Sequence, residues 1–288
     1  MQKLSLSGNF TCPNRDGTLG RGGCTFCNIS SFSGRDNQSL SISEQLCNAN
    51  KKRSSIFLAY FQAYTSTYAE FQLLKKLYDE ALGYPDIVGL CVGTRPDCVP
   101  DEVLDLLEGY MHEGREVWLE LGLQTAIDET LDFINRHHHF FQYADTVRRA
   151  RDRGIKVCTH LIIGLPGEEL IHNLTTLQMV LDEGVDALKL HQLHIVKGSV
   201  MANQYRQGLI PVLDMESYAG IAARIIQNTP PDILFERVSA SVQDDSLIAP
   251  MWSTQRWPCL DRIGEILAES GPQGFETGKP YVYDGISL

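Results

Sequence analysis

The chain of 288 residues is 43% hydrophobic and 21% charged, a composition typical of a folded globular protein with a large apolar core. Its formal net charge of −11 argues against a protein that coats nucleic acid without selectivity, although a local basic patch would still allow binding. The amino-terminal sequence lacks the apolar stretch of a signal peptide, and no run approaches the roughly twenty apolar residues of a membrane span. We therefore expect a cytoplasmic protein with no membrane partner.

Short β-rich runs alternate with helical patterns along the first two thirds of the chain. Near-continuous apolar runs such as IVGLCVG and THLIIGLPG are typical of parallel strands buried on both faces. The expected strands are Lys3–Phe10, Ser55–Gln62, Ile87–Gly93, Glu116–Leu123, Ile155–Gly164 and Val185–Val196. The expected helices are Phe71–Leu82, Val103–Met111, Tyr143–Asp152 and Glu168–Glu183, the last two of which stop at a glycine.

This alternation predicts βαβ units with right-handed crossovers. Six units favour an α/β fold, a partial (β/α)6 TIM-like barrel, over a doubly wound sheet, although periodicity alone does not decide between them. After Val196 the alternation is less regular, with helices expected at Met215–Gln227 and Asp261–Glu269 and a strand-like run at Ile233–Ser239. We therefore predict a barrel core at residues 1–200. A small C-terminal α/β extension at residues 201–288 would pack on this barrel and would not be an independent domain.

Three of the eight cysteines form an unusual group near the N-terminus. Cys12 precedes Cys24 by a glycine-rich stretch of eleven residues, and two residues separate Cys24 from Cys27. Thiolates are soft ligands that suit zinc or iron–sulfur clusters. A glycine-rich loop lets the backbone wrap around a bulky cluster without clashes of Cβ atoms. Disulfides are not expected in a cytosolic chain, and Cys91 and Cys158 lie in apolar runs that predict burial.

The number of ligands in this group is informative. A structural zinc site usually closes with four Cys or His ligands, and no histidine lies near Cys27 at the spacing of a zinc ribbon. A cubane cluster held by three thiolates leaves one iron open for a substrate or cosubstrate. The group follows the first expected strand, at the end where (β/α) barrels place their active sites. A zinc site completed by a distant ligand remains the alternative.

Other polar clusters have ordinary explanations. We interpret the basic run Lys51-Lys52-Arg53 as a solvated loop, and we favour a solvated helix face over a nucleic-acid patch for the arginines at 148, 149, 151 and 153. His137-His138-His139 is interpreted as a solvated loop. His191 and His194 are expected on opposite faces of one strand, because side chains alternate along a strand, so a shared metal site is not expected.

Six ordered blocks between about Lys3 and Pro258 resemble the YhcC/YtqA family of radical S-adenosylmethionine (SAM) proteins, which is related to the radical domain of the elongator catalytic subunit. The blocks are CPNRDGTLGRGGCTFC, AYFQAYTSTYAE, VGLCVGTRPDCVPDEVLDLL, WLELGLQTA, VCTHLIIGLPGE and KLHQLHIVKGS. The resemblance implies a 4Fe–4S cluster on Cys12, Cys24 and Cys27, with Phe26 as the usual aromatic residue before the last ligand. SAM would chelate the open iron through its amino and carboxylate groups.

The family chemistry is a reductive cleavage of SAM. One electron from the cluster yields methionine and a 5′-deoxyadenosyl radical, which removes a hydrogen atom from the substrate. A flavodoxin- or ferredoxin-type protein would supply the electron. The chain departs from the usual family pattern at Asn9 and His137, where relatives have glycine, and at Gln192, where they have proline.

The resemblance also implies contacts to SAM at the ends of later strands. Gln62 and Ala63 match the segment that faces the methionine amino group, and Glu120 and Gln124 are candidates for the ribose hydroxyls. A buried carboxylate satisfied by a neighbouring strand is the alternative for Glu120.

Four further residues complete the predicted cofactor set. Arg95 would bind the SAM carboxylate or form a structural salt bridge with Asp97. Gly164 and Gly167 match the stretch that lets backbone approach the adenine, although a tight strand-to-helix turn would explain both glycines, and His191 is the last member. The sequence does not identify a catalytic acid or hydrogen-atom donor; the candidates are Tyr60, Tyr64, Cys98 and His191.

The resemblance implies a tRNA substrate, modified at the wobble uridine by conversion of a 5-carboxymethylaminomethyl group to a 5-aminomethyl group. Two alternatives stay open: a radical SAM enzyme that acts on a small molecule, and a non-catalytic zinc or iron–sulfur protein.

Overall fold

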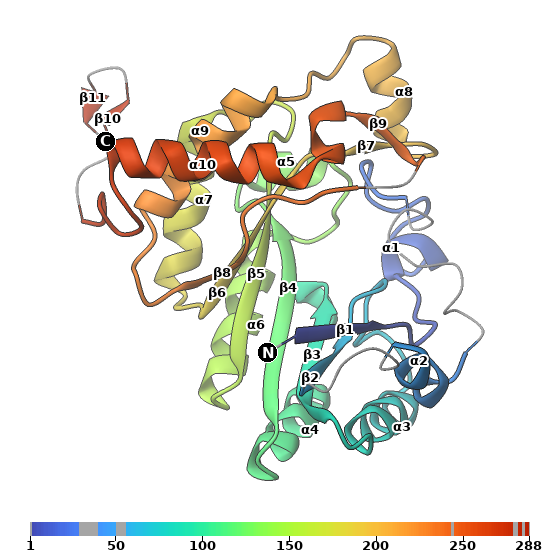
Figure 1. The fold of residues 1–288 in the computed structure, drawn as a ribbon. Coiled ribbons are helices and arrows are strands. Elements are labelled where there is room, and N and C mark those ends of the chain that lie inside the picture. Colours follow the sequence, from blue (N-terminus) through green and yellow to red (C-terminus); the bar gives the residue numbers. More distant parts are fainter. Residues whose placement is uncertain are drawn as a thin grey trace. The chain divides into compact units, whose positions relative to one another are not determined.

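The computed structural model describes residues 2–28, 40–49, 56–242, 245–278, 282–283 and 286–287. The chain divides into two compact units, which are described separately (Figure 1). The first unit comprises residues 1–24, 28–123 and 136–158, and the second comprises residues 25–27, 124–135 and 159–288.

Parallel strands form the centre of the first unit. They are β1 (Gln2–Leu6), β2 (Phe57–Phe61), β3 (Ile87–Thr94) and β4 (Glu116–Gln124). Each pairs in parallel with the next in the chain. All five residues of β2 are buried, as expected for a strand covered on both faces. The predicted strand at Ser55–Gln62 is thereby confirmed in its described part, since Ser55 lies outside the described residues.

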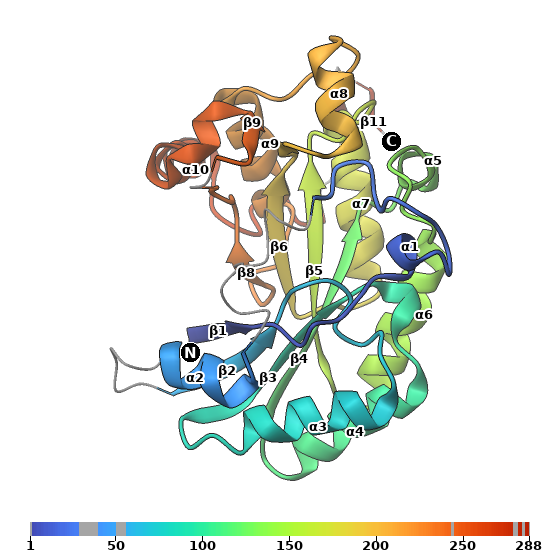
Figure 2. The same ribbon diagram turned by 90° about the vertical axis from the view of Figure 1, so that its right-hand side faces the viewer.

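Helices pack against these strands. Figure 2 shows α3 (Phe71–Leu82) and α4 (Asp101–His112) side by side along one face of the strands. The remaining helices of the unit are α1 (Pro13–Asp16), α2 (Ile42–Ala49), the short 3₁₀ helix η4 (Pro96–Cys98) and α6 (Phe140–Asp152). The apolar residues of α3 recur at helical spacing and bury Leu74, Tyr78, Ala81 and Leu82.

The second unit contains most of β5 (Lys156–Ile163), together with β6 (Ala187–Gln192) and β8 (Leu234–Arg237), which pairs in parallel with β6. Its helices are α5 (Asp128–Phe133), α7 (Leu170–Asp182), α8 (Val200–Arg206), α9 (Met215–Gln227), the 3₁₀ helix η5 (Met251–Thr254) and α10 (Arg256–Ser270). Helix α10 packs along α9 (Figure 1). Two short antiparallel pairs join β7 (Ile195–Val196) to β9 (Leu247–Ala249) and β10 (Val282–Tyr283) to β11 (Ile286–Ser287).

The strand order of the main sheet is β1-β2-β3-β4-β5-β6-β8. Six consecutive strands in sequence order, with helices between them, confirm the predicted α/β fold of the partial (β/α) barrel type. The seventh strand, β8, comes from the region predicted as an extension. The division into a core at residues 1–200 and an extension at residues 201–288 stays a prediction.

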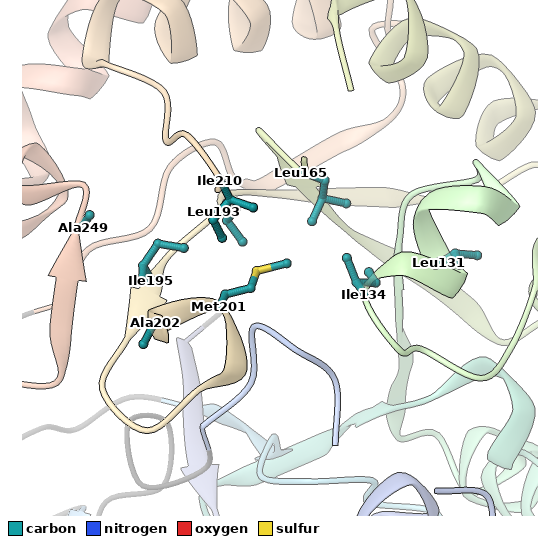
Figure 3. Close-up of a cluster of buried hydrophobic side chains, with 9 residues drawn as sticks. All are labelled: Leu131, Ile134, Leu165, Leu193, Ile195, Met201, Ala202, Ile210 and Ala249. Carbon is teal, nitrogen blue, oxygen red and sulfur yellow. The ribbon is translucent and has the colours of Figure 1, made fainter. Parts of the chain in front are cut away.

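A cluster of buried apolar side chains lies inside the second unit (Figure 3). The Met201 side chain lies in the middle of the cluster and reaches from α8 toward Ile134. The other members are Leu131, Leu165, Leu193, Ile195, Ala202, Ile210 and Ala249. Phe26 packs against this cluster, so the residue before Cys27 is anchored by apolar contact.

Candidate functional site

The cysteine loop begins where β1 has ended. Cys12 is the residue that precedes α1, and its carbonyl accepts hydrogen bonds from the backbone N–H groups of Arg15 and Asp16 at 2.8 and 3.1 Å. The chain then returns over α1, and the N–H of Gly23 donates to the carbonyl of Asn14 at 2.8 Å. Gly23 has a φ of +83°, and a Cβ atom there would lie 2.7 Å from the Arg15 side chain. Glycine is therefore required for the return that brings Cys24 to Asn14.

Two side-chain N–H donors point at the Cys24 sulfur. Asn14 Nδ2 lies 3.5 Å from Sγ, and Arg136 Nη1 lies 3.4 Å from it. Cys24 and Asn14 are buried, and Arg136 is 7% exposed. Hydrogen bonds of this kind favour the anionic form of a sulfur ligand. The surroundings of Cys24 therefore suit a thiolate that binds metal.

Arg95 follows β3, is buried, and contacts the backbone of Arg136. Its guanidinium forms a two-pronged ion pair with Asp97 at 3.0 and 2.9 Å, and its Nη2 donates to the carbonyl of Arg136 at 2.7 Å. Burial acts to lower the pKa of Arg95, but the bonded Asp97 and the Cys24 and Cys12 sulfurs together raise it. The structural salt bridge is thus present. Arg95 Nη1 is buried and has no hydrogen-bond partner among the described residues.

Residues 25–27 belong to the second unit. The N–H of Thr25 donates to the carbonyl of Ile134 at 3.0 Å, and the carbonyl of Thr25 accepts from the N–H of Met201 at 2.9 Å. Cys27 is half-buried. Within the described part of the chain, no three His, Cys, Asp or Glu side chains converge as ligands of one metal ion. A cubane cluster differs from a single ion because each thiolate binds a different iron.

Gln62 and Ala63 follow β2, as the sequence predicted. Gln62 is exposed, and its Oε1 accepts a hydrogen bond from the Ser5 hydroxyl at 3.3 Å. The carbonyl of Ala63 accepts from the Ser66 hydroxyl at 3.4 Å. The backbone that follows is held at Tyr64 in the left-handed region, with a φ of +66°.

Glu120 lies in the middle of β4 and is fully buried. Its carboxylate binds Lys3 Nζ, the Tyr60 hydroxyl and the Cys91 sulfur, each at 2.6 Å. These side chains come from β3, which pairs with β4, and from β2 and β1 beyond it. The structure therefore displays the alternative for Glu120, a carboxylate satisfied by other strands of the sheet, and Tyr60 is engaged in the same network.

Three of the predicted SAM contacts, Gln124, Gly164 and Gly167, have the left-handed backbone conformation that a tight turn needs. Gln124 ends β4 with a φ of +82°, and Gly164 and Gly167 follow β5 with φ values of +91° and +86°. The left-handed region suits glycine and explains both glycines by the turn alone. Next to them, burial raises the pKa of Glu168, while hydrogen bonds from Thr125 and Thr130 act to lower it.

The expectation that His191 and His194 lie on opposite faces of one strand is wrong. Their ring centroids lie 4.8 Å apart in an edge-to-face arrangement. Strand β6 ends at Gln192, so the alternation that would separate the rings does not extend to His194. Burial, then the neighbouring His194, lowers the pKa of His191 to about 3, and burial together with Arg237 lowers that of His194 to about 4. Both imidazoles are therefore neutral near pH 7.

The histidine run after α5 is also only partly as expected. His137 is exposed, but His138 is 2% exposed. Burial, assisted by the charges of Arg136 and Arg95, lowers the pKa of His138 to about 2. Asn9 and His137 both lie in the left-handed region, with φ values of 54° and 56°. These are the two positions at which the sequence resemblance implies glycine.

Two remaining predictions concern Cys98 and the basic clusters. Burial, then Asp97, raises the pKa of Cys98 to about 12, so it remains a thiol. The arginine face of α6 is laced with ion pairs: Arg149 binds Asp101 and Asp145, and Arg153 binds Asp105. This pattern favours the solvated helix face. The run Lys51-Lys52-Arg53 lies outside the described residues.

Comparison with known proteins decides the family. The family model of the radical SAM superfamily matches residues 15–180, and the model of the radical SAM C-terminal domain matches residues 185–269. The chain belongs to the radical SAM superfamily. Protein YhcC of Escherichia coli is 53% identical over 98% of this chain and 92% of its own length, and protein YtqA of Bacillus subtilis is 37% identical over 93% and 85%. The chain is thus a member of the YhcC/YtqA family.

More distant relatives share part of the chain or its fold. The tRNA uridine(34) acetyltransferase of Dehalococcoides mccartyi is 28% identical over 52% of this chain and 33% of its own length. The solved structure of archaeal Elp3 from Methanocaldococcus infernus matches with a TM-score of 0.64 at 15% identity, and covers 99% of this chain and 68% of that one. This last likeness shows the fold.

Membership establishes the enzyme class and its cofactors. Radical SAM enzymes use a 4Fe–4S cluster and SAM, and they need a reductant. The donor set fits this requirement, because Cys24 is buried among N–H donors and Phe26 anchors the Cys27 end of the loop. In the described residues, no helix is long and apolar enough to cross a membrane.

Sequence reasoning missed Asn14 and Arg136. Asn14 lies in the cysteine block that resembles the family, whereas Arg136 lies outside the six blocks, directly before the histidine run. An arginine next to a histidine run gives no sign of burial, and only the fold shows that its guanidinium reaches a cysteine 112 residues away in the chain.

Proposed function

We propose that Cys12, Cys24 and Cys27 hold the 4Fe–4S cluster of this enzyme and leave one iron open to SAM. The spacing of the three cysteines and the N–H donors at Cys24 support this assignment. When bound, the cluster and SAM supply an electron and an adenosyl-centred radical. The chain holds the two cofactors, orients them and excludes water from the radical.

The residues at the ends of β2 to β6 supply the proposed SAM contacts. Arg95 keeps one unpartnered nitrogen, Nη1, for the methionine carboxylate while Asp97 fixes its side chain. Gln62 and Ala63 offer an amide and a carbonyl for the amino group. Gln124 is the stronger candidate for a ribose hydroxyl, because Glu120 already accepts three bonds from its neighbours.

The adenine side of the proposed site is formed by backbone and a neutral ring. Gly164 and Gly167 present no side chain, so the purine can approach the main chain closely. His191 is uncharged near pH 7 because burial lowers its pKa to about 3, and a neutral imidazole can accept or donate a hydrogen bond.

We infer that the substrate is tRNA. The proposed reaction converts the 5-carboxymethylaminomethyl group of the wobble uridine to 5-aminomethyl. The carboxymethyl carbon would lose one hydrogen atom to the adenosyl radical and one electron back to the cluster, and water would hydrolyse the resulting imine to the primary amine and glyoxylate. The single observation that carries this inference is the similarity to the tRNA uridine(34) acetyltransferase. Because the matched segment is only 33% of that relative, its acetyl transfer is not carried over. A flavodoxin- or ferredoxin-type donor in the cytoplasm would supply the electron.

Modified-nucleoside analysis tests the substrate. A strain that lacks the gene should accumulate 5-carboxymethylaminomethyl uridine derivatives in its tRNA and lose the aminomethyl form. A plasmid that encodes the intact protein or its Cys47→Ala variant should restore the modification, because Cys47 is exposed and outside the cysteine loop. The Cys24→Ala variant should not restore it. Wobble uridines unchanged by the deletion would overturn the tRNA proposal.

An assay on the purified protein separates the tRNA proposal from the small-molecule alternative. Reconstituted, reduced enzyme should form 5′-deoxyadenosine faster with bulk tRNA than without it. Its binding of tRNA should weaken as salt rises, because phosphate contacts release counterions. Turnover of SAM with no response to tRNA, and no salt-dependent binding, would favour a small-molecule substrate.

A further inference from the structure

Arg136 is a buried cation that lacks an acidic partner. Its guanidinium is bonded to the Cys24 sulfur and, through Nη2, to the carbonyl of Gly122. No carboxylate pairs with it in the part of the chain that the structure describes, and its Nε has no hydrogen-bond partner there. Arg95 is equally buried but is paired with Asp97. An unpaired buried cation is costly, so the Arg136 site calls for a negative charge.

The Cys24 sulfur is the anion that geometry offers to Arg136. It lies 3.4 Å from Nη1, and a metal-bound cysteine is a thiolate. The guanidinium is held by Nη2, which donates to the Gly122 carbonyl, and the Arg136 backbone is held by Arg95 Nη2, which donates to the Arg136 carbonyl at 2.7 Å. The Arg136 guanidinium is therefore fixed in an orientation that faces the Cys24 sulfur.

Hydrogen bonds to cluster sulfurs adjust the reduction potential of the cluster. Reduction adds one negative charge, and N–H donors on a ligand sulfur stabilise the more negative state. A charged donor has a larger effect than a neutral one. Arg136 should thus outweigh Asn14, whose amide nitrogen lies 3.5 Å from the same sulfur.

We propose that Arg136 is a positioning residue for Cys24 that raises the reduction potential of the cluster, with Asn14 as a weaker second donor. This inference rests on the proposed function, since it needs Cys24 to be a cluster ligand. Without Arg136, the cluster would need a stronger reductant before SAM can be cleaved.

The test is an EPR-monitored redox titration of the anaerobically reconstituted full chain. We expect Arg136→Gln to bind as much iron as the unaltered protein but to show a more negative midpoint potential. Asn14→Ala should shift the potential in the same direction by less. The midpoint potential of Arg136→Lys should lie between those of the unaltered protein and Arg136→Gln. One ammonium group keeps the charge but does not contact both Cys24 and Gly122 as the guanidinium does. Arg153→Gln is the matched control, since Arg153 pairs with surface acids.

The outcomes separate the two proposals. If the unaltered protein and its Cys24→Ala variant bind the same amount of iron, the assignment of the cluster ligands fails. If the unaltered protein holds the cluster and Arg136→Gln has the same potential, the inference about Arg136 fails alone. Should Arg136→Gln lose iron, the other variants decide, and unchanged potentials in both Asn14→Ala and Arg136→Lys would overturn the inference.

Discussion

Two buried polar groups of this protein differ in how well their hydrogen bonds are satisfied. In the first unit, the Glu120 group consists of Lys3, Tyr60, Cys91 and Glu120, and three bonds of 2.6 Å converge on one carboxylate. In the second unit, the histidine pair consists of His191 and His194. His194 is 5% exposed, and neither of its ring nitrogens has a partner among the described residues.

The difference shows what each group contributes. A buried charge with good partners is part of the folded core, and its removal leaves those partners unsatisfied. A buried imidazole without partners lowers stability and is retained only if it serves another purpose. The Glu120 group should therefore contribute strongly to stability, whereas the histidine pair should make stability depend on pH.

The largest effect is expected from Glu120→Ala. The substitution leaves Lys3 and Tyr60 without their shared acceptor, so we expect a loss of about 3–5 kcal/mol in the free energy of unfolding. Urea denaturation at pH 7 measures it. Glu120→Gln, which keeps the size but removes the charge, should lose less. A loss under about 1 kcal/mol for Glu120→Ala would contradict the satisfied network.

The second effect is acid sensitivity from the histidine pair. The folded-state pKa of His194 is about 4, below the usual value near 6.5, so between these values the unfolded state binds more protons than the folded state. The free energy of unfolding should thus fall as pH drops, by up to about 1.4 kcal/mol per pH unit for this residue. His191 and His138 act in the same direction.

His194→Leu isolates this contribution. Its unfolding free energy should be unchanged or higher at pH 7, because an unsatisfied polar group is replaced by an apolar one. Its decline between pH 6.5 and 5 should be shallower by about 2 kcal/mol. His112→Leu is the control, since the His112 side chain is 78% exposed. Equal slopes for His194→Leu and the unaltered protein would show that His194 is not buried neutral.

A third, smaller effect is the coupling between Lys3 and Glu120. Replacement of both partners by apolar residues of similar size, Lys3→Met with Glu120→Leu, should recover part of the loss seen for Glu120 alone. A double-mutant cycle should give a coupling of about 1–3 kcal/mol. Strict additivity of the two single losses would mean that the ion pair at 2.6 Å contributes nothing.

The smallest effect is expected at the surface. Arg153→Ala removes ion pairs to acids of α4 that are exposed, and such pairs contribute about 0–1 kcal/mol. Its unfolding free energy should change within that range and should approach zero change at high salt. A larger loss would mean that the ion pairs between α4 and α6 contribute as much to the free energy of unfolding as the buried polar groups do.

Much of the fold followed from local pattern. The run Ile87–Gly93 was predicted as a buried strand and forms most of β3, and the helix at Phe71–Leu82 has the predicted bounds. Errors occur where the chain bends. The strand predicted at Val185–Val196 is interrupted after Gln192, so His191 and His194 meet. Apolar periodicity cannot reveal such a break when the residues on both sides are buried.

The sequence by itself determined the strand–helix alternation, the cysteine spacing and the family, because these depend on residues close together in the chain. Tertiary structure alone decided which polar groups meet. Lys3 and Glu120 are 117 residues apart, and Cys24 and Arg136 are 112 apart. A side chain's chemistry states that it needs a partner when buried, but only the packing of strands and loops selects the partner.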